Sequence, residues 1–195
     1  MTTSPSPARI LVVCTGNICR SPAVERLLAA RLAGADVEVT SAGTRAVVGA
    51  PVSAPMVPLV RAAGASVEGF AARQLTVDQI READLVIAAT RGHRSAIVEL
   101  VPAVVRRTFT LLELARLVAH VDPQVLHAAG TPGDRVRALP QLAAAVRHVA
   151  GQGVDDVEDP INGSDAVYQA SFDQIAPAVG TIATALQGWV PAATV

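Results

Sequence analysis

Short apolar runs alternate with longer helix-favouring segments along the chain. Runs rich in valine, isoleucine and leucine are typical of buried strands, and four are predicted, at 9–14 (RILVVC), 37–43 (VEVTSAG), 84–90 (DLVIAAT) and 104–111 (VVRRTFTL). Strands that alternate with helices favour parallel pairing, because the chain must cross back over the sheet between strands. We therefore expect an α/β fold in which a four-stranded parallel twisted sheet has helices on both faces.

The segments between the strands carry residues that start and stop helices. The segment 20–34 is expected to be a helix, with Ser21 as its cap and Gly34 as its stop. Three further helices are expected at 54–64, 76–83 and 112–119.

The pattern is less regular after residue 119. The segment 120–134 is predicted to be a loop, and 134–153 a helix broken near Pro140. The chain then closes with a long helix at 164–189, which we expect to bend at Pro177.

No linker or internal repeat divides the chain, so a single domain is expected. Residues 1–8 are polar and proline-rich and are predicted to form a disordered leader, followed by one domain at 9–189 and a tail at 190–195. The uncharged stretch 174–195 has the length of a membrane span, but prolines and glycines interrupt it. A packed terminal helix is therefore favoured over a span.

Composition limits the classes of partner. The 195 residues are 51% hydrophobic and 17% charged, with a net charge of −1, so no general field attracts nucleic acid or a membrane surface. With two cysteines the chain is not a secreted disulfide scaffold, and a cytoplasmic location is expected. Any anion must then be held by local geometry.

The segment between the first strand and the first helix has the residues of an anion-binding loop. Cys14 and Arg20 lie six positions apart, so the intervening backbone N–H groups can converge on one point beside the positive end of the following helix. Arg20 can hold two phosphate oxygens at once. Gly16 can adopt a positive φ or let the backbone approach a ligand.

Cys14 is expected at the bottom of this loop, where the same donors stabilise a thiolate. Attack on a bound phosphate would form a cysteinyl-phosphate that water hydrolyses. Ser21 is expected to donate a hydrogen bond to the sulfur, and Asn17 to pin the loop through its amide. Zinc binding would need a second pair of ligands, and the sequence offers no matching pair. A cysteine that is merely buried at the end of a strand would not account for Arg20 six residues later.

The run VCTGNICRSP (13–22) resembles the active-site signature of the low-molecular-weight protein tyrosine phosphatases, and further stretches follow that family in order. These are TSAGT (40–44), ARQLT (72–76), ADLVIAATRGHRSAI (83–97), FTLLELARL (109–117) and DVEDPINGSDAVYQASFDQI (156–175). The resemblance implies hydrolysis of phosphomonoesters with no metal and no cofactor. It implies a phosphorylated protein, with phosphotyrosine first, or a small phosphomonoester as substrate, and neither nucleic acid nor membrane as partner. The oligomeric state is not indicated.

The resemblance also assigns site residues. Cys14, Arg20 and Asp159 would be catalytic, and substrate would be bound by Thr15, Gly16, Asn17, Ile18, Cys19, Ser21, Val47 and Ile161.

The proton donor in this family is an aspartate before a proline on the loop preceding the last helix, which Asp159 matches. Asp122 is a rival followed by proline, but it does not precede the closing helix and is interpreted as a turn residue. Asp155, Asp156 and Glu158 are interpreted as a solvated acidic approach to the site.

Two aromatic positions of the phosphotyrosine-specific members are aliphatic in this chain. The loop after SAGT offers Val47 and Val48, and Ile161 follows the Asp-Pro pair, which weakens the case for phosphotyrosine. A phosphoarginine phosphatase is an alternative, although that branch usually has threonine in place of Ile18. Arsenate reduction with an external thiol and a binding module without turnover also stay open.

The remaining candidates are weaker. Cys19 is a candidate for a reversible disulfide with Cys14, as in the family, or else a small packing residue. Tyr168 and Phe172 are expected in the core, and Trp189 is not assigned. The four histidines, at 93, 120, 127 and 148, show no metal spacing and are expected in surface or packing positions.

Overall fold

Four parallel strands form the sheet in a computed structural model that describes residues 6–188. The strands lie in the order β2-β1-β3-β4 and are β1 (Ala8–Cys14), β2 (Val37–Gly43), β3 (Leu85–Ala88) and β4 (Thr108–Thr110). The predicted fold class is confirmed. The predicted domain limits remain predictions, because most of the leader, Trp189 and the tail lie outside the described residues.

The side chains of the central strands alternate between two apolar cores. In β1, Ile10 and Val12 face one core, and Leu11 and Val13 face the other. Strand β3 divides in the same way, because successive side chains of a strand point to opposite faces. A nearly continuous apolar run is therefore what a strand buried on both faces requires.

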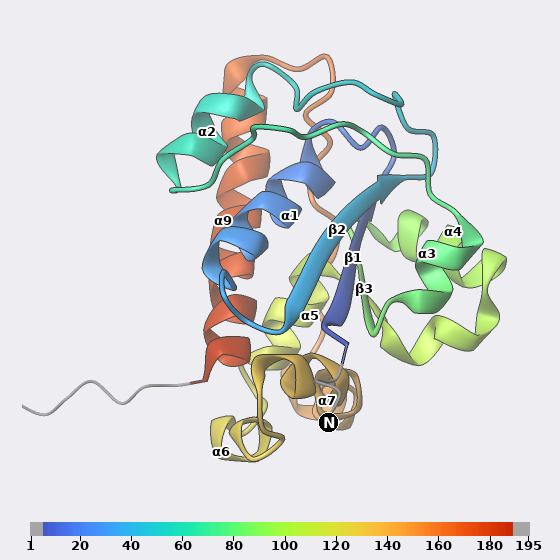
Figure 1. Ribbon diagram of the computed structural model, residues 1–195, viewed down its shortest axis with the longest axis vertical. Coiled ribbons are helices and arrows are strands. Elements are labelled where there is room, and N and C mark those ends of the chain that lie inside the picture. The colour runs from blue at the N-terminus through green and yellow to red at the C-terminus, as the bar shows by residue number, and fades with distance from the viewer. Residues whose placement is uncertain (1–5, 189–195) are drawn as a thin grey trace, which may run out of the picture.

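Helices cover both faces of the sheet, and Figure 1 shows α1, α2 and α9 on one side and α3 and α4 on the other. The first core packs against α1 (Arg20–Arg31), α2 (Met56–Ala62), α5 (Leu111–Val118) and α9 (Asp165–Gln187). The second packs against α3 (Val77–Glu82), α4 (Arg91–Leu100) and the 3-10 helix Pro102–Arg107. All four strands end at the same edge of the sheet, and the segment between β1 and α1 lies there.

The region after α5 differs from the prediction of a loop at 120–134. It contains α6 (Pro123–His127), and α7 (Pro132–Ala145) begins before the predicted start and continues through Pro140 without a break. Thr131 and Asp134 form a capping box that fixes the start of α7. The buried face of α7 holds it against the sheet, and α8 (Arg147–Ala150) follows.

Two other boundaries differ from the sequence prediction. Strand β4 is shorter than 104–111, because the chain before Thr108 forms the 3-10 helix and Thr110 already caps α5. Helix α1 starts at Arg20 with Cys19 as its cap residue, so Ser21 is not the cap.

None of the described helices has both the length and the apolar character that a membrane span requires. Helix α9 instead buries Ile175, Val179, Ile182 and Leu186 against the rest of the protein. It is one continuous helix through Pro177.

Candidate active site

The loop at residues 15–19 joins β1 to α1 and is shaped by a left-handed residue. Asn17 has φ 54°, so the positive φ lies there and not at the expected Gly16. Gly43 at the end of β2 makes the turn possible, because a Cβ atom there would lie 2.4 Å from the carbonyl oxygen of Thr15. The loop therefore depends on a glycine in the neighbouring strand.

The carbonyl groups of this loop are held from outside by the segment 44–53. The backbone N–H groups of Thr44, Arg45 and Val47 donate to the carbonyl oxygens of Cys14, Thr15 and Gly16 at 2.9, 2.9 and 3.0 Å. Within residues 6–188, the N–H groups of residues 16–19 have no acceptor. With the carbonyls turned outward, these N–H groups are available to an anion.

A buried chain of polar side chains supports the sulfur of Cys14. Asn17 Nδ2 donates to Ser21 Oγ at 2.9 Å and to Ser41 Oγ at 2.7 Å, and Ser41 Oγ donates to Glu25 Oε2 at 2.5 Å. Since Ser21 Oγ accepts from Asn17, its own proton is free for Cys14 Sγ, 2.9 Å away. The expected contacts of Ser21 and Asn17 are therefore present, and the Ser21 hydroxyl is oriented toward the thiol.

The backbone N–H of Arg73 and the carboxylate of Glu25 fix the direction of the hydrogen bonds in this network. The backbone N–H of Arg73 donates to Asn17 Oδ1 at 2.8 Å, which leaves only the amide nitrogen of Asn17 to face the serines. Burial raises the pKa of Glu25, and its hydrogen bond from Ser41 together with the charges of Arg26 and Arg73 opposes that rise. The sequence reading did not identify Glu25 or Ser41.

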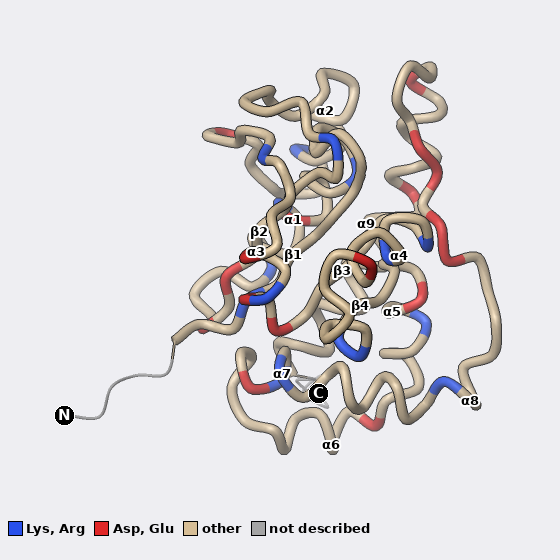
Figure 2. Tube along the Cα trace, turned by 90° about the vertical axis from the view of Figure 1, so that its right-hand side faces the viewer, with Lys and Arg blue, Asp and Glu red and all other residues tan. Residues whose placement is uncertain are grey.

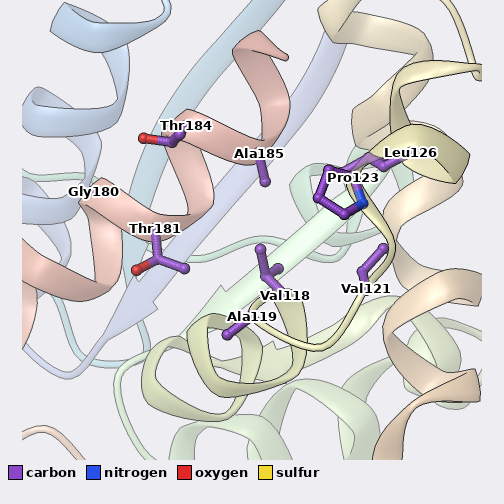
Figure 3. A pocket seen from close by; sticks show the side chains of 9 residues that line it. All are labelled: Val118, Ala119, Val121, Pro123, Leu126, Gly180, Thr181, Thr184 and Ala185. Carbon is purple, nitrogen blue, oxygen red and sulfur yellow. The ribbon is translucent and has the colours of Figure 1, made fainter. Parts of the chain in front are cut away.

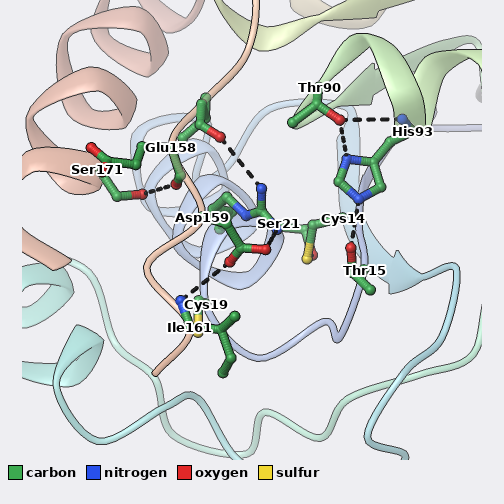
Figure 4. Close-up of polar contacts among 12 residues, drawn as sticks. Cys14, Thr15, Cys19, Ser21, Thr90, His93, Glu158, Asp159, Ile161 and Ser171 are labelled. Atoms are coloured by element: carbon green, nitrogen blue, oxygen red, sulfur yellow. Dashed lines mark hydrogen bonds and ion pairs between the residues drawn. The ribbon is translucent and has the colours of Figure 1, made fainter. Parts of the chain in front are cut away.

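His93 at the start of α4 is a further residue that the sequence reading placed in a surface or packing role. Its ring Nε2 lies 2.8 Å from Thr15 Oγ1 and its Nδ1 lies 2.7 Å from Thr90 Oγ1, as Figure 4 shows. Burial, with the nearby charge of Arg20, lowers the pKa of His93 from its ordinary value of 6.5. The imidazole ring links the anion loop to α4.

Arg20 and Asp159 meet at the mouth of the loop, although 139 positions separate them. Arg20 Nη2 lies 2.5 Å from Asp159 Oδ2, and Arg20 Nη1 donates to the carbonyl oxygen of Val157 at 3.3 Å (Figure 4). The guanidinium is buried, whereas 44% of the Asp159 side chain is exposed. The rival Asp122 instead accepts a hydrogen bond from the Gln124 backbone N–H as the cap of α6.

The segment that carries Asp159 is held in place by ion pairs and hydrogen bonds from α4 and α5. Asp155 pairs with Arg91 at 3.2 Å and with Arg116 at 2.8 Å, and only 17% of its side chain is exposed. Asp156 accepts the Arg91 backbone N–H at 2.7 Å. The expected solvent-facing role is wrong for Asp155, because Arg91 and Arg116 lie against its carboxylate, whereas Asp156 is exposed, as expected. Glu158 is exposed, as expected.

The rim of the site is apolar and open. Val47 is 53% exposed and Ile161 is 46% exposed, and the Ile161 backbone N–H donates to Asp159 Oδ1 at 3.2 Å. Ile18 is half-buried and packs against the first core. Val48 is more exposed still. The side chains of Val47 and Ile161 are therefore available to a substrate, whereas those of Asn17 and Ser21 are buried beneath the loop and hydrogen-bond within it.

Cys19 faces away from the loop. Its Sγ lies 3.7 Å from the hydroxyl of Tyr168, which is also 3.0 Å from Ser53 Oγ. Burial raises the pKa of the Cys19 thiol and of the Tyr168 hydroxyl. Both cysteines are free, and the disulfide between Cys14 and Cys19 stays a prediction.

A separate hollow of about 470 Å³ lies between the α5–α6 segment and α9. Figure 3 shows its lining, which is mostly apolar and includes Val118, Pro123, Leu126 and Ala185. None of its described lining residues has a titratable side chain.

This chain is similar to known proteins of one family. A family model described as low molecular weight phosphotyrosine protein phosphatase matches residues 9–126. The low molecular weight protein-tyrosine-phosphatase Etp of Escherichia coli K12 is 44% identical over 99 residues, covering 51% of this chain and 66% of Etp. The match thus spans slightly less than two thirds of that protein.

A protein-arginine-phosphatase of Geobacillus stearothermophilus is 32% identical over 182 residues, covering 93% of this chain and 97% of that protein. Among solved structures, YwlE arginine phosphatase from the same organism has a TM-score of 0.63 at 31% identity, covering 91% of both chains. The Erwinia amylovora tyrosine phosphatase AmsI has a TM-score of 0.64 at 25% identity, covering 90% of both.

Proposed function

Because the chain belongs to the low molecular weight phosphotyrosine protein phosphatase family, we propose that it hydrolyses phosphomonoesters through a phosphate group carried on Cys14. One observation carries the proposal: a buried thiol, unpaired loop N–H groups and the Arg20–Asp159 pair converge at one point. These are a nucleophile, an anion cradle and a proton donor, which together make phosphoryl transfer possible.

In the first step the Cys14 thiolate attacks phosphorus, and the bond from phosphorus to the ester oxygen breaks. The donated hydrogen bond from Ser21 stabilises the thiolate. Arg20 and the N–H groups of residues 16–19 hold the phosphoryl oxygens, where negative charge gathers in the transition state. The substrate phosphate takes the place of the Asp159 carboxylate on Arg20.

Once displaced from Arg20, the Asp159 carboxylate takes up a proton from solvent and donates it to the leaving oxygen in this step. In the second step its carboxylate accepts a proton from water, which attacks phosphorus. The sulfur–phosphorus bond then breaks and restores the Cys14 thiolate with release of phosphate. Arg20 is thus paired with an anion at every stage, so its buried charge is never left without a partner.

The substrate that the site fits is a phosphorylated side chain on a protein, with phosphotyrosine first. Val47 and Ile161 offer exposed aliphatic surface to an aromatic ring on two sides of the mouth. A cytoplasmic location belongs to the same proposal, and the two free thiols agree with a reducing compartment.

A protein-arginine-phosphatase activity is the second candidate, supported by the similarity to the Geobacillus stearothermophilus protein over 93% of this chain. Ile18 argues against this activity, because the phosphoarginine phosphatases usually have threonine at this position. Turnover of one peptide carrying either phosphotyrosine or phosphoarginine separates the two. We expect the phosphotyrosine peptide to give the higher kcat/KM, and Ile18→Thr to shift the ratio toward phosphoarginine.

The direct test is an acid-quenched reaction with p-nitrophenyl phosphate, followed by mass spectrometry of the peptide that contains Cys14. We expect phosphate on that peptide, and unchanged turnover when a metal chelator is added. Turnover without a phosphorylated Cys14 would overturn the proposed mechanism. Oxidation of an added thiol driven by arsenate, with no ester hydrolysis, would assign the site to arsenate reduction.

A further inference from the structure

A second cleft, of about 810 Å³, opens at the amino ends of β3 and β4. Five arginines line it, and we call it the arginine cleft: Arg94 from α4, Arg106 and Arg107 from the 3-10 helix, Arg137 from α7 and Arg147 from α8. Asp84 is the one carboxylate among its described lining residues. Figure 2 shows arginine positions gathered near β4 and beside α7.

This concentration of charge is local. The whole chain has 16 basic and 17 acidic residues, and every basic residue is an arginine. Arg147 pairs with Glu113 at 2.8 Å, and Arg137 lies 3.6 Å from Asp134 and 3.8 Å from Asp84. For the other three arginines, no carboxylate of the described chain lies within 4.0 Å. The cleft therefore has an excess of positive charge in a protein that is close to neutral.

Two of these guanidinium groups are held in place while keeping donors free. Arg94 Nε donates to the carbonyl oxygen of Thr108 at 2.9 Å, and Arg107 Nη2 donates to that of Arg81 at 2.8 Å. Arg107 Nε is buried and has no partner within residues 6–188. Since a guanidinium carries five N–H donors, most of them remain for a ligand. Because these hydrogen bonds already hold the two side chains in place, ligand binding costs less conformational entropy.

We propose that the arginine cleft binds a small oligophosphate, meaning a ligand with two or more linked phosphate groups. The planar fork of arginine matches phosphate oxygens in pairs. The volume is that of a small-ligand site and far exceeds one orthophosphate. The positive charges come from four separate elements, so they surround a chain of phosphates and do not line up as an extended track for nucleic acid.

This cleft is distinct from the anion loop. The loop follows the carboxyl end of β1, whereas Asp84 and Arg107 immediately precede β3 and β4. Parallel strands place those two ends on opposite edges of the sheet. An oligophosphate in the cleft therefore does not occupy the position of the substrate.

The test is isothermal titration of the full chain with inorganic triphosphate at low ionic strength. We expect two sites, one in the anion loop and one in the arginine cleft. Arg106→Glu should weaken the second site about tenfold or more, and no described contact of the Arg106 side chain is lost. Arg106→Gln with Arg107→Gln is a second variant without charge reversal. Turnover of p-nitrophenyl phosphate should not change in either.

The control variant is Arg61→Gln with Arg81→Gln, two exposed arginines on α2 and α3 that should leave both sites intact. Arg20→Gln should remove the anion-loop site and keep the cleft site. A single site that disappears with Arg20→Gln would overturn the proposal, as would equal binding of orthophosphate or hexaglutamate at the cleft.

Titration with ATP distinguishes two kinds of oligophosphate ligand, a bare phosphate chain and a nucleotide. Equal affinity for ATP and triphosphate identifies the phosphate chain alone as the ligand. Tighter binding of ATP identifies a nucleotide, whose base would pack against the apolar walls at Val105 and Pro140. Both results support an oligophosphate site. Loss of catalytic activity with an intact second site would count against the proposed function only.

Discussion

The floor of the anion loop and the rim around it are built in opposite ways. On the floor, Asn17 and Ser21 are fully buried, and each polar atom of the Asn17 side chain has a named partner. On the rim, the backbones of Val47 and Ile161 are hydrogen-bonded, but their side chains are about half exposed. If the proposed function holds, this difference predicts that reaction chemistry depends on the buried network, whereas substrate choice depends on side chains that can change without disturbing the fold.

The strongest test of this contrast removes the nucleophile from the floor. Cys14→Ser should lower kcat for p-nitrophenyl phosphate by about 10⁴- to 10⁶-fold, because a serine hydroxyl is a much weaker nucleophile than a thiolate. Circular dichroism should show an unchanged fold, since serine fills nearly the same space. Activity within about tenfold of the unmodified protein would contradict the role of Cys14.

Asp159 lies between floor and rim, since it touches buried Arg20 yet is partly exposed. Asp159→Asn should lower kcat by about 10²- to 10⁴-fold for phosphate esters with poor leaving groups, and much less for p-nitrophenyl phosphate. Asp122→Asn is the matched control and should leave turnover unchanged. A larger loss of turnover with the control would transfer the acid role to Asp122.

Asn17→Ala should damage both stability and catalysis. It leaves buried partners unsatisfied and places alanine at a positive φ, so we expect a loss of about 2–4 kcal/mol in the free energy of unfolding. We also expect kcat to fall by about 10²-fold, as the hydroxyl of Ser21 loses its orientation. Urea denaturation and steady-state kinetics measure the two effects.

The rim residue Val48 supplies the control for Asn17. Val48→Ala removes an exposed side chain and should change the free energy of unfolding by less than about 0.5 kcal/mol. If the two substitutions had equal effects, the contrast between floor and rim would fail.

His93 predicts how stability depends on pH. Because its pKa is lowered on folding, the unfolded chain binds more protons than the folded protein below about pH 6.5. Stability should therefore fall as the pH drops from about 7 to about 5, with a slope from this one group of at most about 1.4 kcal/mol per pH unit. His93→Asn should reduce that slope in urea denaturation, and exposed His148→Asn should not.

The smallest effect is expected on the rim. Val47→Tyr should lower KM for phosphotyrosine peptides by about two- to tenfold, since an aromatic contact contributes about 0.5–1.5 kcal/mol. Stability and turnover of small phosphate esters should stay unchanged, as measured by thermal denaturation and p-nitrophenyl phosphate hydrolysis. A fall in turnover of the small ester would show that the rim is coupled to the floor.

The sequence predicts those parts of the molecule whose signals are local. Apolar runs locate all four strands, and the spacing from Cys14 to Arg20 locates the loop. His93 and Ser41 are not identified in this way, because each contacts the loop from an element, α4 or β2, whose position depends on tertiary packing. The same reason applies to Asp155, which reads as a solvated acid until Arg91 and Arg116 are found beside it.

The close approach of Gly43 to the anion loop has a consequence for how the protein folds. In the native register Gly43 lies opposite Cys14, and a slip of β2 by one residue would bring Ala42 or Thr44 to that place. Either side chain would collide with the carbonyl oxygen of Thr15, so the loop cannot close on a misregistered sheet. We therefore expect that a molecule must pair β1 with β2 in the native register before its loop can bind an anion.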